Sequence, residues 1–250
     1  MEIHRNLMIL TGHSRGLGAS LALNALEQGF EVIGIARGML ATEHPNLRQI
    51  QVDLADPDAV LSVLVGLEPD LHPNRLTRAW LVNNAGLLGP VHRVGGQEAQ
   101  DISQAVAVNL QALMLITNWF VEHASNAADR RVVQVSSGAA RSAYVGWSVY
   151  CATKAAVDHY ARCLALEAQA DGPAFGLRIC SLAPGVIDTD MQTQVRASAL
   201  AEFPNRPRFE ALKETGGLAT PHAVAEQLLA YMGSEAFGTE PVADLRSLNR

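Results

Sequence analysis

The sequence predicts an α/β fold: a single doubly wound parallel sheet with helices on both faces. Short apolar runs alternate along the chain with longer amphipathic stretches, as strands alternate with helices in such folds. The apolar runs carry almost no charge, which is typical of parallel strands that are covered on both faces. No linker-like stretch and no repeat divides the chain, so we expect one domain over residues 1–250.

This alternation sets the order of the elements. Strands are expected over 7–10, 30–36, 47–52, 79–82, 131–135, 175–182 and 242–245. Helices are expected over 16–28, from 57 onward, over 101–124, over 149–170 and over 221–232. Gly29 stands where the first helix should stop, and Pro57 and Pro221 suit the first turn of a helix, where no backbone N–H is needed.

The stretch 190–217 departs from the alternation. It joins the expected strand 175–182 to the expected helix 221–232 and carries Pro204, Pro207 and mixed charge. Long connections in a compact domain are usually functional. We therefore expect this segment to form a lid over the substrate.

The composition argues against several classes of function. A formal net charge of −6 and scattered basic residues argue against a nucleic-acid partner. The histidines lack the spacing of metal ligands and the cysteines lack a C-x-x-C spacing, so we expect neither a metal site nor a disulfide framework. The first apolar run is short and no run approaches about 18 residues, so we expect no signal peptide, no membrane span and a cytoplasmic location.

Residues 11–18 form a glycine-rich turn between the first expected strand and the first expected helix. Glycines let the backbone approach a pyrophosphate closely, and the helix N-terminus offers free N–H groups and a partial positive charge. A plain tight turn is the alternative, but the position after the first strand favours a dinucleotide, with His13 beside a phosphate. The residues expected to bind the cofactor here are Gly12, Ser14, Arg15, Gly16, Leu17 and Gly18.

The residue type at the end of the second expected strand indicates whether the chain prefers NAD or NADP. An acid there would accept a hydrogen bond from the ribose 2′-hydroxyl of NAD, but the chain has Arg37 and no acid before Glu43. Arg15 and Arg37 together suit the 2′-phosphate of NADP, which guanidinium groups bind bidentately; two solvated surface arginines are the alternative. Asp53, followed by Leu54, is expected to bind the adenine or to cap the next helix.

Tyr150 and Lys154 stand four residues apart on an expected helix and therefore on one face. A free tyrosine has a pKa near about 10, and a nearby cation lowers it, so this pair suits proton exchange with a carbonyl or alcohol oxygen. An ordinary surface pair is the alternative. Ser136 and Ser137 precede the helix, where either suits a hydrogen bond to the same oxygen or the cap of a turn. The spacing of Asp158 is expected to point it elsewhere.

The residues that carry a family resemblance are spread along the chain: Thr11, Gly12, Gly16, Gly18, Asp53, Asn83, Asn84, Ala85, Gly86, Asn109, Ser137, Tyr150, Lys154, Pro184 and Gly185. With them the chain resembles the short-chain dehydrogenase/reductase family, which implies a Rossmann-like fold. The resemblance selects Ser137, thirteen residues before Tyr150, to polarise a carbonyl, and it makes Tyr150 the acid/base. It implies that Lys154 lowers the pKa of Tyr150 and holds the nicotinamide ribose. It also implies that Asn109 supports a water that relays protons to Lys154; a structural role for Asn109 stays open.

Two further segments follow expected strands at the same edge of the sheet. Small residues at 83–86 let the backbone pass close to the cofactor, while the asparagines there could instead tie strands together. The resemblance places Ile187 and Thr189 near the nicotinamide amide. The cofactor-binding residues expected in the two segments are Asn84, Ala85, Gly86, Pro184, Gly185, Ile187 and Thr189.

The candidates for the substrate pocket are Ala139, Arg141, Tyr144, Trp147, Met191 and Phe203. Core packing is the alternative for the aromatic and Met side chains. Tyr144 and Trp147 are the strongest candidates, and an aromatic cleft suits an apolar carbonyl compound. The ending at 242–246 resembles the sepiapterin and benzil reductase branch of the family.

The sequence therefore predicts an NADPH-dependent reductase of a small, apolar ketone or diketone, with Tyr150 as proton donor. The alternatives are a cofactor-binding regulator without turnover and an NAD-dependent alcohol dehydrogenase. The intact serine, tyrosine and lysine set argues against the first, and Arg37 argues against the second. The resemblance further implies a homodimer or homotetramer built on helices 101–124 and 149–170.

Overall fold

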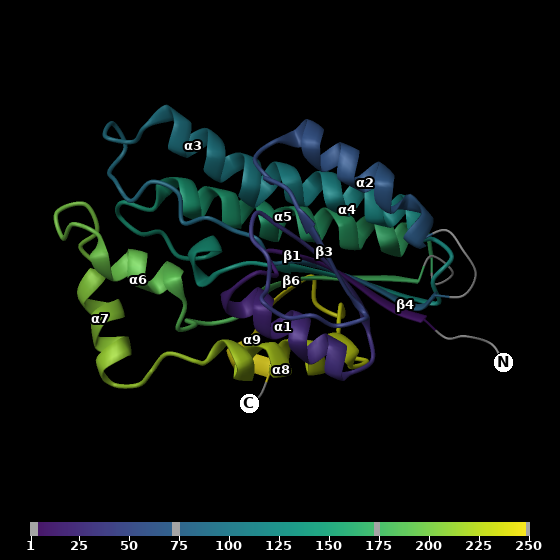
Figure 1. Ribbon diagram of the computed structural model, residues 1–250. Helices are drawn as coiled ribbons and strands as arrows, with labels where there is room; N and C mark the ends of the chain where they lie inside the picture. Colours follow the sequence, from purple (N-terminus) through teal and green to yellow (C-terminus); the bar gives the residue numbers. More distant parts are fainter. Residues whose placement is uncertain (1–4, 72–75, 173–175, 249–250) are drawn as a thin grey trace.

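The computed structural model describes residues 5–71, 76–172 and 176–248. These residues form one seven-stranded parallel sheet in the order β3-β2-β1-β4-β5-β6-β7, which confirms the predicted doubly wound fold (Figure 1). The strands are β1 (Arg5–Thr11), β2 (Glu31–Ala36), β3 (Leu47–Gln51), β4 (Leu76–Asn83), β5 (Asp129–Val135), β6 (Leu177–Ala183) and β7 (Val242–Asp244).

Helices cover the sheet on both sides. The helices are α1 (Gly16–Glu27), α2 (Pro57–Leu71), α3 (Ala99–Val106), α4 (Ala112–His123), α5 (Ser148–Ala170), α6 (Asp190–Ala197), α7 (Arg206–Glu214), α8 (Pro221–Gly233) and α9 (Leu245–Leu248). Figure 1 shows α2, α4 and α5 on one face, α1 and α8 on the other, and α6 and α7 beyond one end of the sheet. A π-helical turn, η1 (Ala107–Gln111), joins α3 to α4, and a 3₁₀ turn, η2 (Gly138–Ala140), follows β5.

Neighbouring residues of the central strands enter different cores. Ile9 and Leu81 pack with α2, α4 and α5, whereas Leu10 and Val82, the next residues along β1 and β4, pack with α1 and α8. Side chains of a strand alternate between its faces, so a strand with helices on both faces is apolar at every position. This is the physical reason why the apolar runs of the sequence mark the strands.

The structure corrects several predicted boundaries. The expected helix 101–124 is α3, η1 and α4 in succession, and the expected strand 79–82 begins at Leu76 because β4 pairs with β1 along its whole length. The strand expected over 175–182 runs over Leu177–Ala183, and Phe175 lies outside the described residues. The expected lid segment contains the helices α6 and α7.

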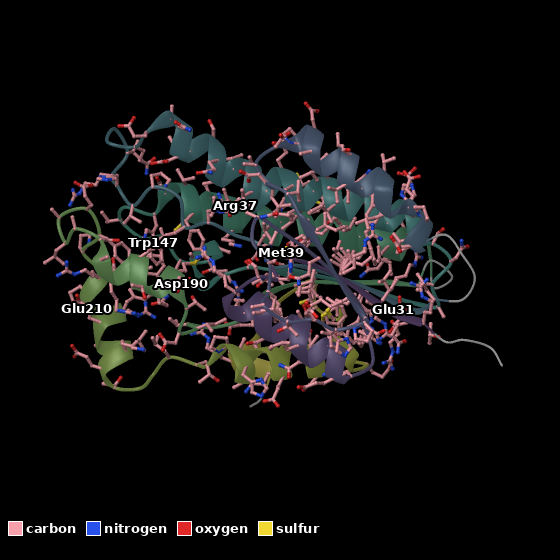
Figure 2. All side chains as sticks on the ribbon, viewed as in Figure 1. Glu31, Arg37, Met39, Trp147, Asp190 and Glu210 are labelled. Carbon is pink, nitrogen blue, oxygen red and sulfur yellow. The ribbon has the colours of Figure 1, made fainter. Side chains whose placement is uncertain are left out.

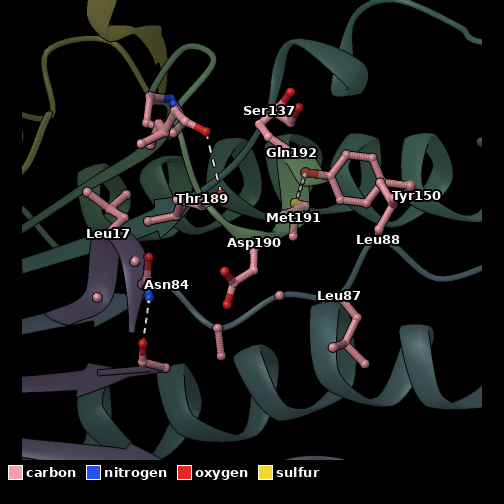
Figure 3. Close-up of a pocket in the computed structure, with 18 of the residues that line it drawn as sticks. Leu17, Asn84, Leu87, Leu88, Ser137, Tyr150, Thr189, Asp190, Met191 and Gln192 are labelled. Atoms are coloured by element: carbon pink, nitrogen blue, oxygen red, sulfur yellow. Dashed lines mark hydrogen bonds between the residues drawn. The ribbon is translucent and has the colours of Figure 1, made fainter. Parts of the chain in front are cut away.

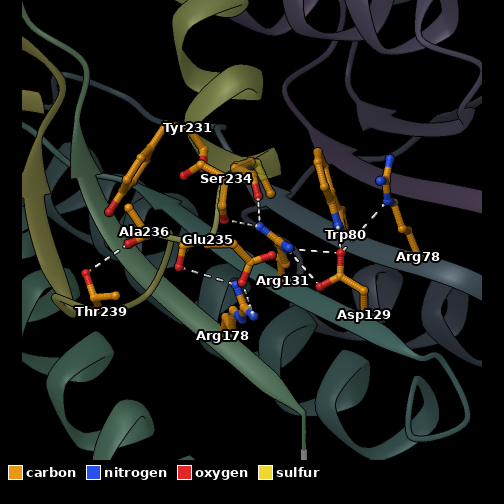
Figure 4. Close-up of polar contacts among 11 residues, drawn as sticks. Arg78, Trp80, Asp129, Arg131, Arg178, Tyr231, Ser234, Glu235, Ala236 and Thr239 are labelled. Atoms are coloured by element: carbon orange, nitrogen blue, oxygen red, sulfur yellow. Dashed lines mark hydrogen bonds and ion pairs between the residues drawn. The ribbon is translucent and has the colours of Figure 1, made fainter. Parts of the chain in front are cut away.

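A polar network ties α8 to the end of the sheet at which β5 begins (Figure 4). The Arg131 guanidinium donates to the Asp129 carboxylate at 2.7 Å and to the backbone carbonyl of Ser234 at 2.7 Å. It also donates to the carbonyl of Met232, and the Trp80 indole donates to Asp129 at 3.3 Å. These contacts lie where the strands begin, so they serve the fold.

The continuous helical stretch Ala99–His123 has the length and hydropathy of a membrane-spanning helix, and half of its most apolar 18 residues are buried inside the protein. Core helices pass the same test of length and composition. Within this stretch α4 packs against β4 and α2. The observation is therefore weak evidence for a membrane span.

Candidate active site

A cavity of about 950 Å³ opens where the strands end (Figure 3). The sheet order reverses between β1 and β4, and open parallel sheets bind ligands at the carboxyl ends of strands beside such a reversal. Figure 2 shows Trp147 and Asp190 beside α6 and α7, and Glu31 at the opposite end of the sheet. The predicted site residues that line the cavity are Gly12, Ser14, Arg15, Gly16, Leu17, Gly18, Arg37, Asp53, Leu54, Asn84, Ala85, Gly86, Ser137, Tyr150, Lys154, Pro184, Gly185, Ile187 and Thr189.

The glycine turn has a shape that only glycine allows. Gly12 and Gly16 have φ angles of +71° and +56°, in the region that other residues rarely adopt. A Cβ on Gly18 would lie 2.0 Å from the carbonyl oxygen of Gly12. The N-cap residue of α1, Arg15, makes no side-chain cap hydrogen bond, so the first N–H groups of the helix are available to an anion. The turn therefore fits a pyrophosphate.

The loop after β4 is tied to this turn by hydrogen bonds. The Thr11 hydroxyl accepts from the backbone N–H groups of Asn84 and Ala85, each at 3.0 Å. The Asn84 side chain donates to the carbonyls of Thr11 and Gly12, and the Asn83 side chain donates to Thr117 on α4. The two asparagines thus tie strands together, which was the alternative to a direct contact with the cofactor. Residues 84–86 nevertheless line the cavity.

Arg37, which directly follows β2, and Arg15 of the glycine turn both line the cavity. Arg15 donates to the Asp190 carboxylate at 3.0 Å, and both side chains are largely exposed. The contact joins the glycine turn to the first residue of α6.

Asp53 lines the cavity, and its carboxylate also accepts from the backbone N–H of Ala55 at 3.0 Å. This bond forms a turn before α2, and the carboxylate that caps the helix is that of Asp56, which accepts from the N–H groups of Asp58 and Ala59, so the prediction that Asp53 caps the helix is wrong.

The prediction that His13 lies beside a phosphate is wrong. Its side chain is fully buried beneath the turn, against Gly34, where a Cβ would come within 2.3 Å of the imidazole. Its Nε2 lies 2.8 Å from the Gln49 side-chain oxygen, and Gln49 binds both the N–H and the carbonyl of Leu40. Burial lowers the pKa of His13. The imidazole therefore supports the loop that follows Arg37.

Tyr150 and Lys154 face one another from successive turns of α5. The Lys154 Nζ lies 5.9 Å from the centre of the Tyr150 ring and donates to the Val135 carbonyl at 2.7 Å. Burial lowers the pKa of Lys154 to about 8. Burial also raises the pKa of Tyr150, and a hydrogen bond with Ser137 opposes that rise. The pKa of Tyr150 is therefore shifted upward, opposite to the lowering that was expected from Lys154.

The two serines after β5 have different partners. Ser137 lines the cavity, and its hydroxyl accepts from the Ala139 N–H at 3.1 Å at the start of η2. The Ser136 hydroxyl instead donates to the buried Asp158 carboxylate at 2.6 Å. Ser137 is thus the serine that lines the cavity with Tyr150, which is the serine that the family resemblance selected.

Asn109, which was predicted to be catalytic, does not line the cavity. It lies in η1 and is 1% exposed. Its side-chain oxygen accepts from the Leu87 N–H at 2.7 Å, and its amide donates to the Leu87 carbonyl and to Thr153. A Cβ on Gly86 would come within 3.5 Å of the Lys154 ammonium and 3.6 Å of the Asn109 oxygen. Asn109 thus holds the cavity wall next to Lys154, and its proposed link to a water stays a prediction.

The substrate end of the cavity has an aromatic wall. The Trp147 and Phe203 rings stack with centroids 4.4 Å apart, and Tyr144 and Phe209 pack around them. Of the predicted pocket residues, Ala139, Tyr144, Trp147 and Met191 line the cavity. Phe203 is fully buried behind Trp147, and Arg141 points to Asp158 instead, so these two predictions are wrong.

Sequence reasoning missed several residues of the cavity and its support. Arg208, Phe209 and Arg246 line the cavity. They lie far from the cofactor and catalytic motifs in sequence, so no local pattern marked them as cavity residues. Asp158 is 2% exposed and, as its spacing predicted, does not line the cavity. Its carboxylate turns instead to the Ser136 and Ser181 hydroxyls, and this support was missed because its partners are remote in sequence. Among the residues that the structure describes, no three His, Cys, Asp or Glu side chains cluster as a metal site.

Comparisons with known proteins agree with this geometry. A family model described as short chain dehydrogenase matches residues 6–200. The chain is 35% identical over 227 residues to a benzil reductase ((S)-benzoin forming) of Bacillus subtilis strain 168, covering 90% of this chain and 93% of the relative. It is 30% identical over 247 residues to the sepiapterin reductase of Rattus norvegicus, covering 92% of each. The crystal structure of a short-chain dehydrogenase/reductase from Burkholderia vietnamiensis superposes with a TM-score of 0.67 at 38% identity, covering 98% of each chain.

Proposed function

The chain belongs to the short-chain dehydrogenase/reductase family, and from that premise we propose that it is an NADPH-dependent reductase of small, apolar ketones or diketones. One observation carries the proposal: Ser137, Tyr150 and Lys154 border the same cavity as the glycine turn and the aromatic wall. The cavity thus brings proton-transfer groups, an anion-binding turn and an apolar surface together. The benzil and sepiapterin reductases among its relatives favour reduction of a carbonyl.

The hydroxyls of Ser137 and Tyr150 are the groups that would hold the substrate oxygen. Tyr150 gives its proton to that oxygen as the carbonyl carbon is reduced, which leaves an alcohol. The Ser137 hydroxyl stabilises the negative charge that develops on the oxygen. Lys154, close to the Tyr150 ring, favours the phenolate that remains after the proton has left.

The nicotinamide cofactor, when bound, supplies the hydride. The glycine turn would hold its pyrophosphate, and the segment 184–189 would border its nicotinamide. The preference for NADP rests on Arg37 and Arg15, because guanidinium groups bind a 2′-phosphate with charge-assisted hydrogen bonds. Since Arg15 also pairs with Asp190, a 2′-phosphate would compete with that carboxylate for the same guanidinium.

The aromatic wall is the reason for proposing an apolar substrate. Trp147 and Tyr144 present ring surfaces to the cavity near Tyr150. Aromatic side chains pack well against planar, apolar groups. A ketone or a vicinal diketone with an aryl or alkyl substituent would place its substituent on this wall and its oxygen at Tyr150.

The test is consumption of NADPH against a panel of aldehydes, ketones and 1,2-diketones. We expect turnover of diketones, a much lower rate with NADH, and a loss of at least about a hundredfold in Tyr150→Phe, because the general acid is removed. Tyr160→Phe, a change of the same kind elsewhere on α5, should keep the wild-type rate. Diketone turnover that survives Tyr150→Phe would refute the assigned proton donor.

Two other outcomes would support the alternatives. NADPH binding without turnover of any carbonyl would favour a regulator that only senses the cofactor. Equal rates with NADH, together with alcohol oxidation, would favour an NAD-dependent dehydrogenase. Arg37, which directly follows β2, argues against the second alternative, because an acid at that place would be expected for NAD.

A further inference from the structure

Asp158 is a buried carboxylate that the proposed chemistry does not use directly. It lies on α5, one helical turn after Lys154, and is 2% exposed. A charge in such a place is expensive unless it is paired and hydrogen-bonded. Its contacts therefore indicate what it does.

The carboxylate joins three consecutive strands at their carboxyl ends. Its Oδ1 accepts from the Ser136 hydroxyl at 2.6 Å and from the Ser181 hydroxyl at 2.7 Å. Its Oδ2 lies 3.4 Å from the Nε of Arg141, whose guanidinium also donates to the Ala243 carbonyl at 3.1 Å. One side chain of α5 thus fixes the ends of β5, β6 and β7 relative to that helix.

The same contacts reach the catalytic groups. Ser136 is bonded to Asp158 and immediately precedes Ser137, so the carboxylate fixes the backbone from which Ser137 projects. Lys154 hydrogen-bonds the carbonyl of Val135, the residue before Ser136. The negative charge of Asp158 favours the ammonium form of Lys154 against the effect of burial. The carboxylate therefore acts on Ser137 through the backbone and on Lys154 through charge.

We propose that Asp158 is a positioning residue, which holds Ser137 in place and keeps Lys154 protonated for the carbonyl chemistry. The kinetic consequence of this inference rests on the proposed function. The effect of the Asp158 charge on the protonation of Lys154 does not depend on that function. The cation that pairs with Asp158 is Arg141, which lies at the end of η2. Cys180 of β6 lies on the other face of the sheet, against Tyr231, and burial raises the pKa of its thiol to about 11, so it is neutral at pH 7.

The chain allows a direct measurement because it contains two lysines, Lys154 and Lys213. Labelling with ε-¹³C lysine gives two NMR signals, and Lys213→Arg assigns them. In Asp158→Asn the Lys154 titration midpoint should fall by about one pH unit or more, because a neighbouring negative charge has been removed. In Arg141→Gln the midpoint should rise, because the carboxylate then acts on Lys154 without the competing cation.

The two variants keep the test decisive. If Asp158→Asn alone fails to fold, which its melting temperature would show, the midpoint of the double variant Asp158→Asn/Arg141→Gln, compared with that of Arg141→Gln, still tests the electrostatic coupling, because removal of both partners leaves no unpaired charge. A merely structural role for Asp158 would leave the Lys154 midpoint unchanged by Asp158→Asn in either background, and that result would overturn the proposal. Ser181→Ala removes one hydrogen bond but no charge, so its midpoint should stay within a few tenths of a unit of wild type.

Kinetics distinguish this inference from the proposed function. In Asp158→Asn we expect kcat for carbonyl reduction to fall about tenfold, with the KM for NADPH nearly unchanged, because the glycine turn is untouched. Unchanged kcat would overturn the positioning of Ser137. If the wild-type protein reduces no carbonyl but the Lys154 midpoint shifts as expected, the proposed function fails while the coupling of Asp158 to Lys154 stands.

Discussion

Lys154 shows how a buried residue of the candidate active site can cost stability. Burial lowers its pKa from the ordinary 10.5 to about 8, so the unfolded chain holds this proton more tightly than the folded one. The free energy of unfolding is therefore reduced most below pH 8, and the cost disappears as the pH rises towards 10.5. A buried ammonium at this position is useful for proton transfer and unfavourable for folding.

The direction of this pH dependence can be tested with Lys154→Met. Between pH 7 and pH 10.5 the free energy of unfolding of the wild type should rise, relative to that of the variant, by about 3 kcal/mol. Denaturant titrations of both proteins at several pH values measure the difference. A difference that does not change with pH would show that Lys154 titrates alike in the folded and unfolded chains.

At the residue scale, spacing predicted some positions and missed others for a physical reason. Tyr150 and Lys154 are four apart on a helix, so helical geometry alone puts them on one face. The positions of His13 and Asp158 depend on groups that are remote in sequence, Gln49 for the first and Ser181 for the second. Such tertiary partners have no local signature, so a polar side chain that turns inward cannot be distinguished from one that meets the ligand.

At the scale of the element, the long helix over Ala99–His123 contains a feature that periodicity did not predict. The apolar pattern predicted an uninterrupted helix, but five residues at Ala107–Gln111 form a π-helical turn. This turn carries Asn109, whose amide binds both backbone groups of Leu87 and the Thr153 hydroxyl. Insertions of this kind occur often at functional sites. They leave the mean periodicity almost unchanged, which is why the sequence showed a single helix.

The segment of α6 and α7 remains a predicted lid. Met191, Gln192 and Val195 of α6 line the cavity, and α6 begins at Asp190, the partner of Arg15. We expect amide hydrogen exchange over 190–217 to slow when NADPH is added, because a bound ligand would fill the cavity under α6. Exchange in β4 should not change. Equal exchange over 190–217 with and without NADPH would contradict a lid.

At the scale of the whole molecule, the alternation of strands and helices was sufficient to predict the sheet. Right-handed crossovers between parallel strands leave few topologies, and all of them gather the carboxyl ends of the strands at one edge. The motifs at 11–18, 83–86, 136–137 and 184–189 each follow a strand, so their convergence around one cavity follows from the topology. Tyr144 and Trp147 of the aromatic wall were predicted, but Phe209 was not, because it reaches the wall from α7, outside the alternating pattern.

The predicted homodimer or homotetramer belongs to the same scale. Leu166 on α5 and Val106 on α3 are 66% and 39% exposed, and α3 packs beside α5, so both helices present apolar side chains to solvent in the isolated chain. Burying them against a second copy would remove that surface from water. We expect light scattering after gel filtration to give two or four times the mass of one chain.

Leu166→Asp tests which surface makes that assembly. A carboxylate at this position would be desolvated in an interface through α5, so the variant should run at the mass of one chain. Val65→Asp is the matched control, because Val65 on α2 is 64% exposed and the interface is expected on α5. If Val65→Asp dissociates the assembly and Leu166→Asp does not, the copies meet through α2. A wild-type protein at the mass of one chain would show that these apolar side chains stay in water.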